Sequence, residues 1–250
     1  METMKYLIHG ACGRMGRVVQ RVIREKLPDT DLILVDPMAK EDDVYTAISD
    51  YKGKADCIID FSHHSAAPAL TAWAMAHKVP LVIATTGQTE EELACIRRAS
   101  EQVPVLLASN FSLGIVVLTA LAKQAAKAFP EADIEIVETH HNRKLDVPSG
   151  TALTLAQAVQ SVRPGSRLVI GRHENGKREP ADIGVHSLRM GNIVGVHEIH
   201  ICTDTQTLTL RHEAHDRALF AEGALTAAQW VVTMEPGLYD MQSILNGILQ

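Results

Sequence analysis

The N-terminal part of the chain alternates between short apolar runs and amphipathic segments. Apolar runs of about four to six residues, without polar alternation, are typical of parallel strands buried on both faces. Between these runs, apolar residues recur at helical spacing. The pattern therefore predicts strands at residues 4–9, 31–36, 57–62, 80–85 and 103–108, and helices at 13–26, 65–78 and 90–102. Strands that alternate with helices indicate an α/β fold with a Rossmann-like, doubly wound parallel sheet.

The pattern changes after Asn110. A long apolar helix is predicted at residues 115–129, a strand at 134–140 and another helix at 151–162. From residue 183 the reading is antiparallel, because polar and apolar residues alternate as in strands with one exposed face. These strands are expected at residues 183–190, 193–202 and 207–213, with a Gly191-Asn192 turn between the first two, and a helix follows at 217–232. The second part should therefore be an α+β domain with a mixed, largely antiparallel open sheet.

Composition and charge narrow the class of protein. The chain has 250 residues, 46% of them hydrophobic, so two globular domains are expected. A net charge of −6 without long runs of one sign argues against nucleic acid or a membrane as partner. No apolar run approaches the roughly 18 residues of a membrane span, and the N-terminus lacks the pattern of a secretory signal. The scattered cysteines, Cys12, Cys57, Cys95 and Cys202, indicate reduced thiols in the cytoplasm.

A glycine-rich turn lies between the first predicted strand and the first helix. Gly10, Gly13 and Gly16 follow the spacing G-x-x-G-x-x-G, in place of the commoner G-x-G-x-x-G. Such glycines bring backbone N–H groups and a helix N-terminus close to a pyrophosphate. Asp36 ends the second strand, twenty residues after Gly16 (36 − 16), where an acidic side chain accepts hydrogen bonds from the adenosine ribose. A chance glycine turn and a solvated aspartate are the alternative, and together the features favour dinucleotide binding.

Two more strand ends carry small and hydroxyl side chains. Ala84-Thr85-Thr86 follows the fourth strand, and Ala108-Ser109-Asn110-Phe111 follows the fifth. Ligands of open α/β sheets bind beyond the carboxyl ends of the strands. These two segments therefore suit a nicotinamide ribose and carboxamide, although each alone is compatible with an ordinary loop.

The segment from His140 to Thr151 lies between a strand end and a helix start, and it is rich in residues suited to proton transfer and anion binding. Two histidines, an arginine and Lys144 stand within five residues, and Ser149, Gly150 and Thr151 begin the helix. Hydroxyls and free N–H groups at a helix start form an anion site, and histidine is a natural proton donor near neutral pH. The alternatives are a solvated histidine pair and a simple helix cap. The combination predicts a site that clamps a dicarboxylate and supplies a proton.

Two further pairs of histidines raise the alternative of a metal site. His197-Glu-Ile-His200 lies on a predicted strand, where residues three apart point to opposite faces, and His212-Glu-Ala-His215 straddles a strand end. We therefore expect no metal.

At these residues the chain strongly resembles the dihydrodipicolinate reductase family. The matching blocks run in order along almost the whole chain: GACGRMGR, IIDFS, ATTG, ASNFSLG, ETHHNRKLDVPSGTAL, LRMGNIVGVHEI and GLYDM. The resemblance implies that residues 1–112 and 216–250 form a dinucleotide-binding domain. Residues 113–215 would bind the substrate and build a homotetramer through their sheets.

The resemblance also implies the reaction and its residues. NADH and/or NADPH would reduce 4-hydroxy-tetrahydrodipicolinate/dihydrodipicolinate to tetrahydrodipicolinate in lysine (diaminopimelate) biosynthesis, with hydride from nicotinamide C4 and a proton from His140. The implied cofactor residues are Gly10, Ala11, Cys12, Gly13, Arg14, Met15, Asp36, Ala84, Thr85, Thr86, Ala108, Ser109, Asn110 and Phe111. Lys144 would stabilise negative charge, and the implied substrate residues are His141, Lys144, Ser149, Gly150 and Thr151.

The chain departs from the family at two positions, and the second of them leaves the choice of cofactor open. Ala84 stands where many members have glycine, and Pro37 follows Asp36 where some members have an arginine that meets a 2′-phosphate. The choice between NADH and NADPH therefore stays open. The alternative functions are another two-domain NAD(P)-dependent dehydrogenase of a small amino or dicarboxylic acid, and a non-catalytic dinucleotide sensor.

Overall fold

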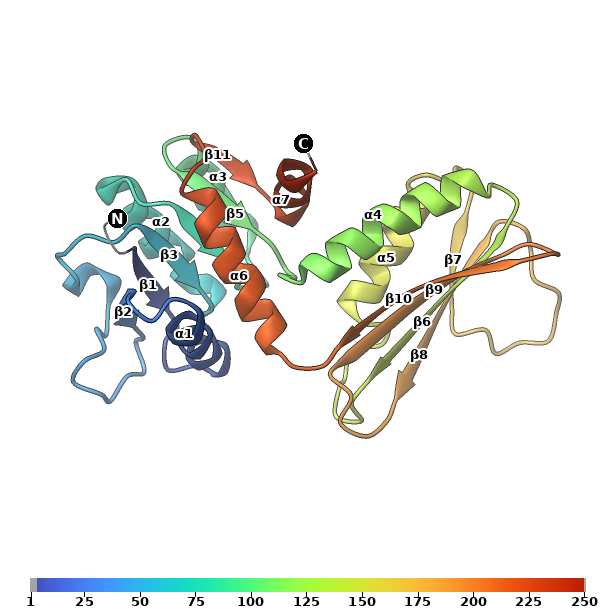
Figure 1. Cartoon of the computed structure of the whole chain (residues 1–250), viewed down its shortest axis with the longest axis horizontal. Helices are drawn as coiled ribbons and strands as arrows, with labels where there is room; N and C mark the ends of the chain where they lie inside the picture. The colour runs from blue at the N-terminus through green and yellow to red at the C-terminus, as the bar shows by residue number, and fades with distance from the viewer. Residues whose placement is uncertain (1–3, 250) are drawn as a thin grey trace. The chain divides into compact units, whose positions relative to one another are not determined.

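The computed structural model describes residues 4–249 and divides the chain into two compact units (Figure 1). One unit contains the residues up to Ser112 and those from Ala218 onward, and the other is Leu113–Arg217. The first unit is therefore assembled from both ends of the chain. Of the helices described, none is long and apolar enough to cross a membrane.

The first unit is built on a six-stranded sheet in the order β11-β5-β4-β3-β1-β2. Every pairing is parallel, which confirms the Rossmann-like α/β prediction. The strands are β1 Lys5–His9, β2 Asp31–Val35, β3 Cys57–Asp60, β4 Leu81–Ile83, β5 Pro104–Leu107 and β11 Gly237–Tyr239. Strand order reverses between β1 and β3, and the carboxyl ends of strands at such a reversal are where α/β sheets bind ligands.

Helices cover this sheet. Those of the first unit are α1 Arg14–Lys26, α2 Ala67–His77, α3 Glu90–Ser100, α6 Ala218–Val231 and α7 Met241–Ile248, with short 3-10 turns η1 Ile48–Asp50 and η2 His64–Ala66. α1 packs with α6, and α2 packs with α3. A capping box fixes the start of α3: the Thr89 hydroxyl accepts from Glu92 N–H, and the Glu92 carboxylate accepts from Thr89 N–H. The sequence did not predict β11 or α7.

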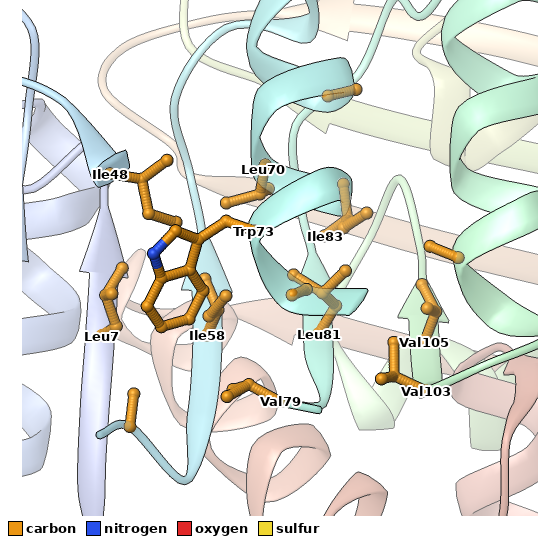
Figure 2. Close-up of a cluster of buried hydrophobic side chains, with 14 of the residues drawn as sticks. Leu7, Ile48, Ile58, Leu70, Trp73, Val79, Leu81, Ile83, Val103 and Val105 are labelled. Carbon is orange, nitrogen blue, oxygen red and sulfur yellow. The ribbon is translucent and has the colours of Figure 1, made fainter. Parts of the chain in front are cut away.

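A buried cluster joins the sheet to α2 (Figure 2). Trp73 from α2 lies against Leu7 of β1, Ile58 of β3 and Ile48 of η1. Leu7 and Ile58 are fully buried, and a buried leucine or isoleucine contributes about 1.5–3 kcal/mol. This packing holds α2 against one face of the sheet.

The second unit is built on a five-stranded sheet in the order β10-β9-β6-β8-β7, which is mixed as predicted. It is not largely antiparallel, because β6-β8 and β8-β7 are parallel while β10-β9 and β9-β6 are antiparallel. Its strands are β6 Asp133–His140, β7 Arg167–Ile170, β8 Asp182–Arg189, β9 Gly195–Cys202 and β10 Thr207–Ala214, and its helices are α4 Leu113–Ala128 and α5 Gly150–Gln160. Ile134 and Ile136 of β6 join the core that α4 and α5 complete. On the other face Leu188 keeps 47% of its surface exposed.

The sequence predicted that the two strands joined by the Gly191-Asn192 turn lie side by side, and this is wrong. The strands on either side of Gly191-Asn192, β8 and β9, run in opposite directions, but β6 lies between them. Thr139 of β6 pairs with Leu188 of β8 on one side and with Val196 of β9 on the other. The link at residues 190–194 is long enough to cross the two strand spacings, about 10 Å in all, that β6 occupies. The turn pattern in the sequence predicts that the chain reverses direction. It cannot predict that another strand lies between the two strands that the turn joins.

Candidate active site

Glycines shape the turn between β1 and α1. Gly10 has a φ of +82°, and a Cβ there would come within 2.6 Å of the Phe61 carbonyl oxygen. At Gly16 a Cβ would lie 2.1 Å from the Gly10 carbonyl oxygen, so only glycine lets α1 start this close to the turn. Gly10 and Gly16 are therefore required because other parts of the backbone approach them closely.

Several N–H groups of this turn are used to hold its shape. Three groups expected at the pyrophosphate donate inside the unit: Ala11 N–H to Val35 O, Cys12 N–H to Asp36 Oδ2 and Gly13 N–H to Gly10 O. The N–H groups of Arg14 and Met15 lie in the first turn of α1, where a helix has no acceptors of its own. The part of the motif suited to an anion is therefore its end, at Arg14 and Met15.

Asp36 closes the turn from the end of β2. Its carboxylate accepts from Cys12 N–H and from Met38 N–H, each at 2.9 Å, and only 7% of the residue is exposed. The side chain is therefore held in place and still lines the adjoining cavity.

A cavity of about 710 Å³ adjoins the turn. It lies over the ends of β1, β2 and β3, and its lining includes Gly10, Asp36, Met38, Ile48 and Trp73. This volume is in the range of small-molecule and cofactor sites. Apolar walls suit a flat base and Asp36 suits a ribose, so the residues present fit the adenosine part of a dinucleotide. The sequence did not identify Met38, Ile48 or Trp73 as lining residues.

A second buried carboxylate, Asp60, ends β3 beside this cavity. Asp60 is 2% exposed, and its Oδ1 lies 2.8 Å from His9 Nδ1. Oδ1 also accepts from Ser62 N–H and the Ser62 hydroxyl, at 3.2 and 2.6 Å. Oδ2 accepts from the Thr85 hydroxyl at 2.7 Å. Asp60 therefore fixes the orientation of Thr85, and the sequence analysis missed both Asp60 and His9.

The two segments expected near a nicotinamide follow neighbouring strands. β4 and β5 pair with Ile83 opposite Leu107, so residues 84–86 and 108–111 leave the same edge of the sheet. Asn110 Oδ1 accepts from Ser112 N–H at 2.8 Å, and the Phe111 ring is buried beside Phe61. The side chain of Phe111 therefore supports the segment from within the core.

In the second unit, β6 places Glu138 and His140 on one face, because strand residues two apart point the same way. Glu138 is fully buried, and its Oε2 is hydrogen-bonded to Nδ1 of His140, which is 9% exposed. Burial works to raise the pKa of Glu138, but hydrogen bonds from His140 and Arg189 outweigh it and hold that pKa at about 2. Glu138 is therefore ionised at every pH of interest.

The start of α5 also meets this carboxylate. Ser149 N–H donates to Glu138 Oε1 at 3.2 Å. The Ser149 hydroxyl accepts from Ala152 N–H at 3.2 Å and lies 3.3 Å from His197 Nε2. Since Ser149 is 2% exposed, its side chain is a helix cap, and the open part of the expected anion site is the backbone that follows. A Cβ added at Gly150 would meet nothing within 4 Å.

His197 of β9 lies against His140. Their ring centroids are 5.2 Å apart in an edge-to-face arrangement. Burial, together with the charge of His140, lowers the pKa of His197 to about 4, so this ring is neutral near pH 7. His200, its partner in the metal alternative, lies on the opposite face of β9 and contacts Thr209. Among residues 4–249 no group of three or more His, Cys, Asp or Glu side chains is arranged to hold a metal.

The loop after β6 carries the remaining candidate residues. Lys144 Nζ lies 2.8 Å from Asp146 Oδ2, and Lys144 contributes to the low pKa of His197. Arg189 Nη2 donates to the Asp146 carbonyl at 2.7 Å and to Glu138 Oε1 at 2.8 Å. His141 Nε2 lies 3.4 Å from Arg217 Nη2. Burial, followed by the charges of Arg143 and Arg217, lowers the pKa of His141 and so favours its neutral form.

The structure thus separates the expected residues into two groups, one in each unit. His140, Lys144 and the start of α5 belong to the second unit, where Glu138, Arg189 and His197 accompany them. The sequence did not identify Glu138 or Arg189, and it considered His197 only as a metal ligand. One signal was available for Glu138, because it stands two residues before His140 on a predicted strand. Arg189 and His197 are about fifty residues away, and only the sheet brings them in.

Family models match both parts of the chain. The model described as dihydrodipicolinate reductase, N-terminus, matches residues 4–111, and the model described as dihydrodipicolinate reductase, C-terminus, matches residues 114–245. A relative from Caldanaerobacter subterraneus subsp. tengcongensis, named 4-hydroxy-tetrahydrodipicolinate reductase, is 42% identical over 97% of this chain and 98% of its own. A relative of the same name from Akkermansia muciniphila is 40% identical, over 96% and 97%.

A solved structure agrees with the fold. A dipicolinate-bound dihydrodipicolinate reductase from Paenisporosarcina sp. TG-14 is similar with a TM-score of 0.81 at 24% identity. The match covers 97% of this chain and 99% of that chain.

Proposed function

The chain belongs to the dihydrodipicolinate reductase family, and from that premise we propose that it reduces 4-hydroxy-tetrahydrodipicolinate to tetrahydrodipicolinate. The cofactor is NADH and/or NADPH, and the step belongs to lysine (diaminopimelate) biosynthesis. Relatives of about 40% identity over nearly the whole chain favour this function over another two-domain dehydrogenase or a dinucleotide sensor.

The observation that carries the proposal is the grouping around His140. A buried imidazole with a fixed carboxylate partner, a lysine and an open helix start are held by one strand, one loop and one helix of a single unit. That is the chemistry a dicarboxylate needs when it must be held and protonated.

In the first unit, the start of α1 at Arg14 and Met15 holds the pyrophosphate, and Asp36 holds the adenosine ribose. The ends of β4 and β5, at residues 84–86 and 108–111, support the nicotinamide side. When bound, the nicotinamide supplies the hydride, and the protein contributes binding, orientation and electrostatics. The first unit, with residues up to 112 and from 218, thus acts as the dinucleotide-binding domain, two residues later than the boundary expected at 216.

In the second unit, His140 gives a proton to the ring carbon next to the one that is reduced. Lys144 stabilises the negative charge that develops, and the N–H groups at Gly150 and Thr151 bind one carboxylate. Ser149 holds that helix start in place, and neutral His141 contributes a hydrogen bond. The second unit, residues 113–217, acts as the substrate-binding domain.

The protein is further proposed to be a cytoplasmic homotetramer. The face of the mixed sheet opposite α4 and α5 carries exposed Leu188, and such a face is suited to a partner sheet. All four cysteines are free thiols, which is compatible with a reducing compartment.

Turnover with freshly generated substrate tests the function. Aspartate semialdehyde and pyruvate are condensed by a dihydrodipicolinate synthase, and nicotinamide absorbance is followed after the chain is added with NADH or NADPH. We expect absorbance to fall only when chain, synthase and cofactor are all present. Consumption of cofactor only in the reverse direction, with NAD⁺ and an amino acid, would favour the dehydrogenase alternative.

A further inference from the structure

Glu138 serves three parts of the second unit with two oxygens. Oε2 meets Nδ1 of His140, while Oε1 accepts from Arg189 Nη2 and from Ser149 N–H. Arg189 in turn donates to the carbonyl of Asp146, in the loop that carries Lys144. One fully buried carboxylate therefore connects the proton donor, the start of α5 and the substrate loop.

The charge state of Glu138 decides the role of each nitrogen of His140. An ionised carboxylate only accepts hydrogen bonds, so Nδ1 of His140 must be the donor in their contact. The nitrogen that remains for the substrate is Nε2.

The surroundings of Nε2 agree with this assignment. Gly195 of β9 lies next to the ring, and a Cβ built there would come 3.1 Å from His140 Nε2. Gly195 leaves space beside this nitrogen, because the Cβ of any other residue would crowd it.

We propose that Glu138 is the positioning residue of the reaction: it directs Nε2 of His140 to the substrate and ties that ring to the helix start and loop that bind it. The proposal rests on the proposed function. In the proton step the Nε2–H bond breaks and a C–H bond forms on the carbon adjacent to the one that accepts hydride from the nicotinamide. His140 is left neutral with its proton on Nδ1, Glu138 stays ionised, and water returns a proton to Nε2.

The charges around the pair fix the sign of the expected pH effect. Glu138 on β6 is the negative group, Arg189 on β8 and Lys144 on the loop are positive, and His197 on β9 is neutral near pH 7. His141 follows His140, and His212 on β10 lies beyond His197. Without the charge of Glu138, the protonated ring of His140 loses the carboxylate that faces it, while Arg189 stays positive and Lys144 stays paired with Asp146, so its charged form is stabilised less.

The decisive variant is Glu138→Gln, measured as kcat against pH. We expect kcat to fall about 10²-fold or more, since loss of the carboxylate behind a catalytic histidine costs up to about 10⁴-fold. The alkaline limb of the profile should move to lower pH by about one unit or more, and KM for the cofactor should stay unchanged. A lower kcat with an unmoved alkaline limb would reduce Glu138 to a structural residue and overturn the proposal.

Asp182→Asn is the matched control. Asp182 is 2% exposed, bonds Arg167 at 2.7 Å, and lies seven residues from Arg189 along β8 (189 − 182), or about 23 Å. It removes a buried carboxylate from the same sheet, far from His140. We expect a lower melting temperature and an unmoved alkaline limb; a limb that moves as in Glu138→Gln would also overturn the proposal.

Two further variants test the proposal if Glu138→Gln does not fold. Glu138→Asp keeps the charge but withdraws the oxygen, and should lower kcat about tenfold with an unmoved limb. Gly195→Ala crowds Nε2 and should lower kcat several-fold while binding of pyridine-2,6-dicarboxylate, measured by calorimetry, is retained. Wild-type kcat in both would contradict the proposal. A wild type without turnover would instead refute the proposed function, while calorimetry and melting still show whether the site is formed.

Discussion

Replacement of Gly16 by alanine tests whether the turn after β1 holds the dinucleotide. The added Cβ would lie 2.1 Å from the Gly10 carbonyl oxygen and 2.9 Å from Ala11 Cα, both backbone atoms. Relief of such a contact requires the turn or the start of α1 to move by about 1 Å, and overpacking of this kind costs about 1–3 kcal/mol.

The same movement displaces the N–H groups of Arg14 and Met15. A hydrogen bond to a charged group contributes about 1.5–3 kcal/mol, so misalignment of both groups should cost about 3 kcal/mol of binding. That loss corresponds to an increase of about 10²-fold in the Kd for NADH. Gly13→Ala is the graded control, because its Cβ would lie 3.2 Å from the same oxygen and requires only a small adjustment.

The assay is calorimetric titration of each variant with NADH and, separately, with pyridine-2,6-dicarboxylate. We expect the Kd for NADH to rise in the order wild type, Gly13→Ala, Gly16→Ala. Binding of the dicarboxylate should stay unchanged, because its site is proposed in the other unit. An unaltered Kd for NADH in a folded Gly16→Ala variant would refute the placement of the pyrophosphate.

His140→Gln should lower kcat about 10²-fold or more with little change in NADH affinity, measured by steady-state kinetics and titration. Lys144→Ala should weaken calorimetric binding of pyridine-2,6-dicarboxylate by about 1.5–3 kcal/mol, and unchanged binding would move the anion site elsewhere. Asp36→Ala should raise kcat/KM for NADPH relative to NADH, because Asp36 repels a 2′-phosphate; an unaltered ratio would show that it does not contact the ribose. His197→Gln should reduce acid destabilisation: a pKa lowered from 6.5 to about 4 gives stability that is complete above pH 6.5 and lost, by about 3 kcal/mol, as pH falls to 4. Melting of both proteins across that range measures it, and equal losses would contradict the assignment.

The parallel sheet could be predicted because its central strands are recognisable from their own residues. β1, β3 and β4 are buried on both faces, so their apolar runs carry the signal without reference to the rest of the chain. β11 could not be predicted, because Gly237-Leu-Tyr is short and pairs with β5, more than a hundred residues earlier. The central place of β6 was missed for the same reason: which strands flank it is decided by long-range pairing.

The sites show the same division. The residues of the glycine turn and of the His140 segment lie close together in sequence, so their spacing was informative. Asp60 meets His9 and Thr85 from 51 and 25 residues away, and Arg189 reaches Glu138 across 51. In the sequence, nothing marks a carboxylate that will be buried and hydrogen-bonded to distant side chains. Only the fold brings those partners together. Ser149 illustrates the converse, because its hydroxyl proved to be a helix cap and only the neighbouring backbone suits a ligand.

A single-turnover experiment tests the central claim most directly. The chain saturated with NADH is mixed with freshly generated substrate, and nicotinamide absorbance is followed for wild type and His140→Gln. We predict that wild type oxidises one NADH for each substrate reduced, and that His140→Gln gives the same stoichiometry about 10²-fold more slowly. Unchanged absorbance in wild type, or equal rates in the two proteins, would contradict the account.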